Sequence, residues 1–352
     1  MLPYIISLFF SLLIMHFAIK TKNHLVKYLL HLFAVTPSVF LLTFRSDLCG
    51  TDTPNYIRLF DYLNSASLQQ YISEVRYEPL FAILTFSLKK LGLSIECFFL
   101  VSALLTIIPV YIGSIKLRKF VSPLIPMALF YLMFYQYSFN IVRQSIAMSI
   151  CFLGYVYLVI EGKSIISFLL GVTAVLFHTV SIVYIFTFFI FQFLGRMSFK
   201  FLLINASLII VLIYLYPLFF SDRVEYLEGY LSYSSGVSTQ LSYLVEMTLN
   251  FLIVIIFYKK DKIGLRRYFM IVSGIGAIVI AFSSIGHYAF RVANCIDIMA
   301  LLYVPLALKN AGSRIYYFFY LIFAVFFWWF VFIFNNSGGS YPYILSPTFN
   351  YF

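Results

Sequence analysis

The chain has 352 residues, of which 62% are hydrophobic and 11% are charged, and its mean hydropathy is +0.96. Soluble domains carry about 25% charged residues, so this composition excludes an ordinary soluble protein and is typical of a polytopic membrane protein. The net charge of +11 comes from basic residues dispersed over short loops. This dispersal excludes a nucleic-acid-binding face and fits the excess of lysine and arginine in cytoplasmic loops.

The N-terminal segment 3–19 is apolar, lacks a basic region before it and has no small-residue cleavage site after it. It is therefore predicted to be a first spanning helix rather than a cleaved signal. The basic segment 20–27, KTKNHLVK, follows it and marks the cytoplasmic side, as does KKDKIGLRR at 259–267. Weaker markers of the same kind lie at 116–120, 195–200 and 309–314.

With these segments inside, the sequence predicts an all-α fold in a single transmembrane domain, 1–352, with both termini outside. About 12 transmembrane helices are expected, within a range of about 10–14. The predicted spans are 3–19, 28–45, 95–114, 121–139, 142–160, 165–177, 180–194, 201–218, 243–258, 268–286, 291–308 and 315–334. Segment 78–92 must then start and end outside, which predicts a re-entrant or interfacial helix. A rival count makes 78–92 a span and 165–194 one helix, but it places Lys116 and Lys163 outside, against the charge rule.

Under this topology, the longest polar interval, 46–77, is predicted to be an extracytoplasmic loop. It contains three aspartates, Asp47, Asp52 and Asp61. Asp52 lies among Gly, Thr and Pro, so a turn or helix-cap role is the alternative to a functional one. Glu78 precedes Pro79 at the start of an apolar segment and has a similar alternative as a cap.

Later segments bring further polar side chains to the same predicted face. Asn140, Arg143 and Gln144 share one helix face at the outer start of a span. His178 lies at an outer turn, where a structural histidine is the plain alternative. Segment 287–297 carries His287 and Arg291 at another outer helix start, with Asn294 and Asp297 deeper. Charged groups inside a membrane favour a functional role, whereas arginines at helix ends also snorkel or form structural ion pairs, and Asp297 could partner an arginine.

Five motifs occur in a fixed order along most of the chain, between about residues 45 and 300. They are GTDTPNY at 50–56, YEPLF at 77–81, NIVRQSIAMSI at 140–150, FHTVS at 177–181 and FRVANCIDI at 290–298. This ordered set resembles the EpsG family of bacterial polysaccharide polymerases, which are related in role to Wzy, the O-antigen and capsule polymerase.

The resemblance implies a multi-pass glycosyltransferase of the bacterial inner membrane, with its active site facing the periplasm or the cell exterior. Such an enzyme polymerises undecaprenyl-diphosphate-linked oligosaccharide units into O-antigen, capsule or exopolysaccharide. The expected partners are that lipid-linked oligosaccharide, membrane lipid and, as a further candidate, a chain-length regulator protein. We expect no cofactor and no nucleic acid. The four cysteines show no metal-ligand spacing, and no metal is expected.

The same resemblance suggests roles for the polar residues. A diphosphate leaving group needs cations, and arginine offers a permanently charged fork, so Arg143 and Arg291 are the first candidates, with Arg45 and Arg76 behind them. The attacking hydroxyl needs a general base, for which Asp52 and Glu78 come first and His178 third. The predicted substrate-lining residues are Tyr56, Asn140, Gln144 and His287.

Three other activities stay open from sequence. A glycan ligase would share the outer-face arginines and differ only in its acceptor. A flippase or transporter of lipid-linked oligosaccharides would favour charges lining a path through the bilayer centre. A membrane acyltransferase could use a single histidine such as His178.

Overall fold

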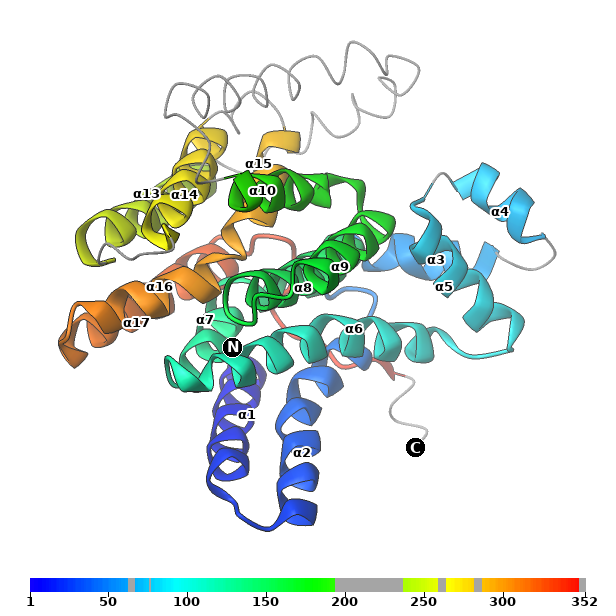
Figure 1. The fold of residues 1–352 in the computed structure, drawn as a ribbon. Helices are drawn as coiled ribbons and strands as arrows, with labels where there is room; N and C mark the ends of the chain where they lie inside the picture. Colours follow the sequence, from blue (N-terminus) through cyan, green and yellow to red (C-terminus); the bar gives the residue numbers. More distant parts are fainter. Residues whose placement is uncertain (63–66, 76, 194–236, 259–263, 282–286, 348–352) are drawn as a thin grey trace. The chain divides into compact units, whose positions relative to one another are not determined.

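The computed structural model describes residues 1–62, 67–75, 77–193, 237–258, 264–281 and 287–347. These residues fold into helices, and β-structure among them is limited to one isolated antiparallel bridge between Arg45 and Leu345. The all-α class is therefore confirmed. The chain divides into two compact units, residues 1–181 with 319–352, and residues 182–318 (Figure 1). The assignment of 1–352 to a single domain stays a prediction.

The first unit begins with an antiparallel hairpin of α1, Leu2–Lys20, and α2, His24–Thr43 (Figure 1). The side chain of Asn23 accepts a hydrogen bond from the Val26 amide and so caps the start of α2. The helices that follow are α6, Ile95–Lys116; α7, Leu124–Met133; α8, Val142–Val159; and α9, Ser164–Phe177. Because α8 packs against both α6 and α9, 83% of its residues are buried, and it forms the centre of this unit.

The polar interval 46–77 contains two short helices, α3, Thr53–Tyr62, and α4, Leu68–Val75, and its extracytoplasmic position stays a prediction. Both helices are amphipathic, and the low mean hydropathy of the interval gave no sign of them. The α4 residue Tyr71 packs against Ala82 of the next helix, α5, Pro79–Lys90. A helix at 78–92 is thus confirmed, and at 12 residues α5 is shorter than the roughly 20 residues that a crossing requires.

The described residues of the second unit include five complete helices and the start of another. They are α10, Ile182–Phe193; α13, Val237–Phe257; α14, Leu265–Ala281; α15, His287–Asp297; α16, Ala300–Asn310; and the first residues of α17, Arg314–Trp328. Helix α13 packs against α14 and α16, and α15 packs against α10 and α14. The predicted span 201–218 lies outside the described residues.

Among the described residues, 6 helices are long and apolar enough to cross a membrane, or 7 if the bent pair Ala289–Asp297 and Ala300–Asn310 counts as one span. The six are Leu2–Lys20, His24–Thr43, Ile95–Lys119, Val142–Val159, Gln240–Phe257 and Arg314–Phe334. Each coincides with a predicted span. Shorter apolar helices occupy other predicted spans: Leu124–Met133, Ser164–Phe177 and Thr179–Phe193. The chain is a polytopic all-α membrane protein.

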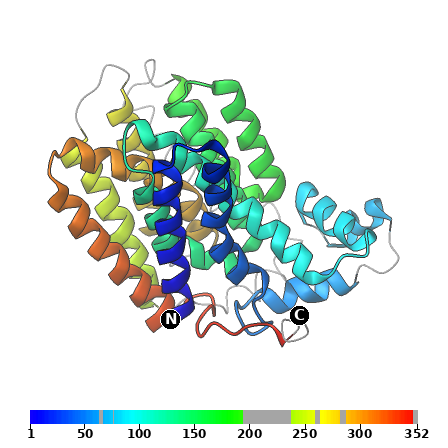
Figure 2. The same cartoon turned by 90° about the horizontal axis from the view of Figure 1, so that it is seen from below.

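Residues Ser337–Ser346, here called the C-terminal strap, run back along one end of the first unit, next to the start of α1 (Figure 2). The Ser46 amide donates to the Ile344 carbonyl at 2.9 Å, and the Ser346 amide donates to the Phe44 carbonyl at 2.8 Å. The Tyr4 hydroxyl of α1 donates to the Ser340 carbonyl. The start of α1 and the C-terminal strap thus lie at the same end of this unit.

Candidate functional site

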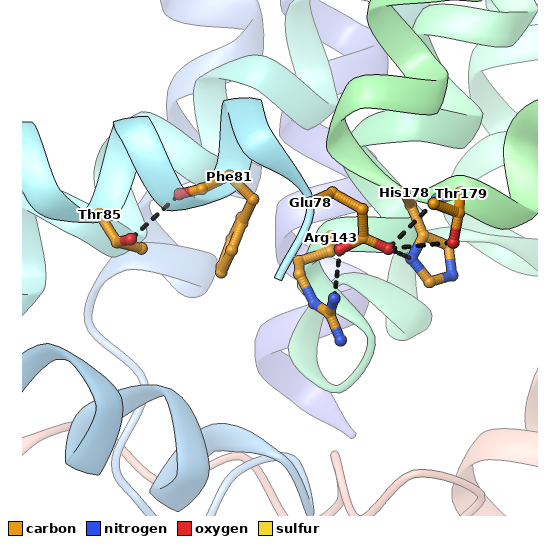
Figure 3. Close-up of polar contacts among 6 residues, drawn as sticks. All are labelled: Glu78, Phe81, Thr85, Arg143, His178 and Thr179. Atoms are coloured by element: carbon orange, nitrogen blue, oxygen red, sulfur yellow. Dashed lines mark hydrogen bonds and ion pairs between the residues drawn. The ribbon is translucent and has the colours of Figure 1, made fainter. Parts of the chain in front are cut away.

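Glu78 lies immediately before α5, where Pro79 occupies the first turn of the helix. The residue before a proline is forced towards extended backbone, and Glu78 has φ −62° and ψ 145°. Its carboxylate makes no cap hydrogen bond to α5. It points away from that helix, towards α8 and the end of α9 (Figure 3). Glu78 thus occupies the N-cap position of α5, as considered from sequence, but its carboxylate does not cap the helix and is available for contacts between segments.

Four interactions meet at this carboxylate (Figure 3). We call the residues that form them, Glu78, Arg143, His178 and Thr179, the Glu78 cluster. One oxygen, Oε2, forms an ion pair with Nη1 of Arg143. The other, Oε1, lies 2.9 Å from Nδ1 of His178 and accepts from the Thr179 amide at 3.1 Å and the Thr179 hydroxyl at 3.4 Å. Three segments that are far apart in sequence thus converge on one buried acid, which is 9% exposed.

His178 is placed by the end of α9. Its amide closes the last helical turn on the Ala174 carbonyl at 2.9 Å, and its own backbone is extended. An ionised carboxylate only accepts hydrogen bonds, so Nδ1 of His178 must carry the proton in the contact with Glu78. In the neutral imidazole, Nε2 then carries the lone pair. The contact therefore selects the tautomer whose Nε2 can accept a proton.

Arg143 lies in the first turn of α8, and aromatic rings hold its guanidinium. The guanidinium carbon is 4.2 Å from the centre of the Tyr77 ring and 5.7 Å from that of Phe81. A ring face attracts a cation, so these contacts fix the plane of the guanidinium. The side chain remains 19% exposed, although Glu78 already neutralises it.

The surroundings set the charge of these groups. Burial alone would raise the pKa of the Glu78 carboxyl, but the His178 hydrogen bond and the Arg143 charge outweigh it and lower this pKa below its ordinary value. Glu78 is thus held as a carboxylate. Burial raises the pKa of the neighbouring Tyr56 hydroxyl, and the nearby Arg143 charge offsets only part of this rise. Tyr56 is therefore a neutral phenol beside a charged guanidinium.

The GTD turn, Gly50–Thr51–Asp52, lies against the segment that leads into α8. The side-chain oxygen of Asn140 accepts from the Thr51 hydroxyl at 2.6 Å and from the Asp52 amide at 2.8 Å. Asp52 itself is half-buried at the start of α3. Gln144 is buried on α8, one residue after Arg143. The structure thus brings Asp52, Asn140 and Tyr56 to the same end of the first unit as the Glu78 cluster.

Arg45 is 4% exposed and lies just after α2. Its Nη1 donates to the carbonyls of Leu42 at 3.2 Å and Ser138 at 3.3 Å, and its guanidinium carbon lies 4.1 Å from the centre of the Phe99 ring. Burial lowers the pKa of Arg45 to about 10. These contacts connect α2 to the segment before α8. A diphosphate-binding role for Arg45 stays a prediction.

The remaining predicted site residues belong to other parts of the chain. Arg291 is half-buried on α15 in the second unit. His287 begins the same helix, but its side chain lies outside the described residues, as does Arg76. Sequence reasoning missed Thr179, whose amide contact with Glu78 has no sequence signature.

The second unit contains a polar cluster that sequence reasoning also missed. Asn250 of α13 donates to Glu246 on the same helix and, at 3.2 Å, to Asp297 of α15. These contacts give Asp297 an amide partner, and both alternatives raised from sequence, an arginine partner and a direct role, stay predictions. The four-residue spacing of Glu246 and Asn250 within an apolar segment was the sequence signal that could have found them.

Among the described residues, no group of three or more His, Cys, Asp or Glu side chains is placed to hold a metal ion. The family model described as the EpsG family matches residues 28–345. The chain belongs to the EpsG family. Comparisons with curated proteins and with solved structures found no match. Membership of EpsG supports a polysaccharide-polymerase-like role for this membrane protein.

Proposed function

We propose that this EpsG protein is a membrane glycosyltransferase that polymerises undecaprenyl-diphosphate-linked oligosaccharide units at the outer face of a bacterial inner membrane. The observation that carries the proposal is the Glu78 cluster, in which one carboxylate orients a histidine and an arginine. The reaction needs both a base for an incoming hydroxyl and a cation for a leaving diphosphate. The cluster offers both within one set of contacts.

His178 is the general base in this proposal. The pKa of Glu78 is lowered and its oxygens already accept four contacts, so Glu78 is a weak proton acceptor. Its carboxylate instead holds the His178 imidazole in one tautomer and stabilises the imidazolium that forms when Nε2 takes a proton. His178 thus moves ahead of Glu78 and Asp52 among the three catalytic candidates.

The transfer step follows from these assignments. A hydroxyl oxygen of the new lipid-linked unit attacks the anomeric carbon of the growing glycan, and its proton passes to Nε2 of His178. A new glycosidic C–O bond forms as the bond from the anomeric carbon to the diphosphate breaks. The electron pair leaves with the diphosphate, which departs as undecaprenyl diphosphate. No nucleotide sugar takes part.

Arg143 assists the leaving group. The guanidinium carries five N–H donors, and Glu78 engages only one terminal nitrogen, Nη1. The 19% exposure of the side chain leaves part of the group open to an anion. Tyr77 and Phe81 fix its plane, which favours a planar two-point contact with phosphate oxygens. Arg291 remains a second candidate cation, and Tyr56, Gln144 and His287 remain candidate contacts to the glycan.

A transporter of lipid-linked oligosaccharides is the second candidate function, because the second unit contains polar groups within its membrane helices. Glu246 and Asn250 lie on α13, and Asp297 ends α15, all three of them buried. Ionisable groups in such helices often mark transport pathways. The proposed experiment therefore reports on both activities.

The experiment is complementation of a deletion strain, with surface glycan resolved as a ladder on a gel and lipid-linked units assigned to a membrane side. We expect His178→Gln and Arg143→Ala to leave single repeat units at the outer face. Matched controls are His24→Gln and Arg118→Ala, whose side chains are exposed and far along the chain from the cluster. At equal membrane levels, both controls should restore the ladder.

Two outcomes contradict the proposal. If the deletion traps lipid-linked units on the cytoplasmic side, the protein is a transporter. If the His178 and Arg143 variants both restore full ladders, the Glu78 cluster does not carry the reaction.

A further inference from the structure

We propose that Asn140 is a positioning residue, which locks the GTD turn onto the start of α8 and so sets Tyr56 against Arg143. This inference deepens the proposed function and rests on it. From sequence, Asn140 was a candidate contact to substrate. Its contacts in the fold assign its amide oxygen to the protein itself.

The Asn140 side-chain oxygen makes two hydrogen bonds to the GTD turn. It accepts from the Thr51 hydroxyl at 2.6 Å and from the Asp52 amide at 2.8 Å. A carbonyl oxygen has two lone pairs, so these bonds use its full acceptor capacity. The Asp52 amide lies at the start of α3 and would otherwise need another acceptor. Asn140 therefore works through its acceptor, and its NH₂ group takes no part in these two bonds.

The GTD turn is shaped to approach this segment closely. Gly50 has φ +94°, and a Cβ at this position would lie 2.1 Å from the Phe139 carbonyl oxygen. Glycine is thus required at position 50 by both backbone conformation and space. The Thr53 hydroxyl adds a further contact, because it donates to the Cys49 carbonyl at 2.7 Å and to the Phe139 carbonyl at 3.2 Å.

Both sides of this contact lead to Arg143. On one side, α3 begins at Thr53 and places Tyr56 one turn later, within electrostatic range of the Arg143 guanidinium. On the other side, Asn140 precedes α8, whose first turn carries Arg143. Because Asn140 joins the two helix starts, its loss should let α3 move relative to α8. Tyr56 would then be displaced, and the Arg143 side chain would be held less firmly.

The C-terminal strap covers the outside of the turn. The Gly50 amide donates to the Gly339 carbonyl at 2.8 Å, and the Thr51 amide donates to the Gly338 carbonyl at 3.0 Å. Beneath the strap, Cys49 is fully buried, with its sulfur 3.5 Å from the Ser340 carbonyl oxygen. Cys49 is therefore a natural reporter of whether the turn and the strap are closed.

The activity test compares two substitutions at one position. Asn140→Asp keeps an acceptor oxygen for Thr51 and Asp52, whereas Asn140→Ala removes it. We expect polymerisation by Asn140→Ala to fall about 10-fold or more and that by Asn140→Asp to stay within about 3-fold of the unmodified protein. Thr51→Val removes one of the same bonds from the other side. It should lower activity about 3-fold alone and add nothing to Asn140→Ala.

The labelling test does not depend on activity. In a protein with Cys97→Ser, Cys151→Ala and Cys295→Ala, Cys49 is the remaining thiol. We expect a membrane-impermeant maleimide to modify it slowly, and about 10-fold faster after Asn140→Ala. Asn140→Asp should keep the slow rate.

The outcomes separate this inference from the proposed function. If Asn140→Asp is as inactive as Asn140→Ala while Cys49 stays protected in both, the amide contacts substrate and the positioning role is overturned. If Asn140→Ala keeps full activity and protection, the role is also overturned, and the polymerase proposal stands. If the unmodified protein does not polymerise, the proposed function fails, and the labelling rates still decide whether Asn140 closes the turn.

Discussion

The two units handle buried acids in opposite ways. In the first unit, Glu78 lies at a helix start and meets Arg143, His178 and the Thr179 amide, so its charge is neutralised and its oxygens are satisfied. In the second unit, Glu246 and Asp297 are linked by the neutral amide of Asn250, and no ion pair with a cation occurs for them among the described residues. One acid is compensated by positive charge, and the other two are linked by an uncharged group.

The two groups of contacts are therefore suited to different tasks. Buried charge is tolerated when a partner of opposite sign and hydrogen bonds accompany it, and a substrate anion can then exchange with part of that partner's contacts. The Glu78 cluster has this composition. The polar cluster of the second unit, Glu246, Asn250 and Asp297, has two carboxyl groups and one amide. These groups suit a structural contact between α13 and α15 or a transport role better than a reaction that expels a diphosphate.

The largest effect should come from neutralising Glu78 in the first unit, with Glu246 of the second unit neutralised for comparison. Glu78→Gln keeps the size of the side chain and removes its charge, so His178 loses the group that stabilises its imidazolium. We expect the polymerisation rate to fall roughly 10²- to 10⁴-fold, the usual contribution of general acid–base catalysis. Glu246→Gln should stay within about 3-fold, because an amide can still bond to Asn250. The rate of ladder formation in membranes with matched protein levels measures both.

A reversed result would contradict the assignment of the chemistry to the first unit. If Glu246→Gln stops glycan assembly and Glu78→Gln does not, the chemistry or transport belongs to the second unit. Asp61→Asn is the matched acid control, since Asp61 is 69% exposed and its Lys89 partner lies 3.9 Å away. Exposed pairs of this kind contribute little, so this variant should behave like the unmodified protein.

A smaller effect concerns stability and pH. The pKa of Glu78 in the folded protein is lowered from an ordinary value of 4.5, so its contribution to stability is full above about pH 4.5 and is lost as the pH falls further towards the folded pKa. Glu78→Gln should therefore lower the thermal unfolding midpoint by the same amount at every pH between 5 and 8, and the gap should narrow below pH 4.5. The expected decrease in the free energy of unfolding is about 3 kcal/mol, as for breaking a buried ion pair.

The measurement needs a background without the imidazole. Comparing His178→Gln with His178→Gln/Glu78→Gln in detergent removes the titration of His178 from both proteins. A gap that changes between pH 6 and 8 in this background would mean that Glu78 itself titrates there. The neutralisation of Glu78 by Arg143 would then be weaker than the contacts suggest.

The sequence was sufficient to predict the fold class and the long apolar helices. Long apolar runs predicted the six spanning helices, because apolar length is the main requirement for crossing a bilayer. The two helices inside the polar interval were not predicted, since α3 and α4 are short and amphipathic, and the α4 residue Tyr71 is buried against Ala82 of α5 only in the folded chain.

The residues of the candidate site could largely be predicted from sequence, but the contacts between them could not. Glu78, Arg143 and His178 were each candidates from their residue type and position, but sequence does not say which side chains touch. The carboxylate of Glu78 reaches Arg143, 65 positions away, and His178, 100 positions away, only because α5, α8 and α9 pack together. The same packing gives Thr179 its contact and assigns the oxygen of Asn140 to the GTD turn.

The smallest effect in the Glu78 cluster should come from Thr179. Its amide bonds to Glu78 at 3.1 Å and survives any side-chain substitution, whereas the hydroxyl bond is 3.4 Å long and therefore weak. Thr179→Val should lower the polymerisation rate only about 2- to 5-fold, the equivalent of a modest neutral hydrogen bond, and Thr179→Ser should leave it unchanged. Initial rates in membranes measure this. A loss as large as that of Glu78→Gln would mean that the hydroxyl, rather than Arg143 and the backbone amide, fixes the carboxylate. The first unit would then resemble the second, with neutral side-chain groups rather than opposite charge holding its acid in place.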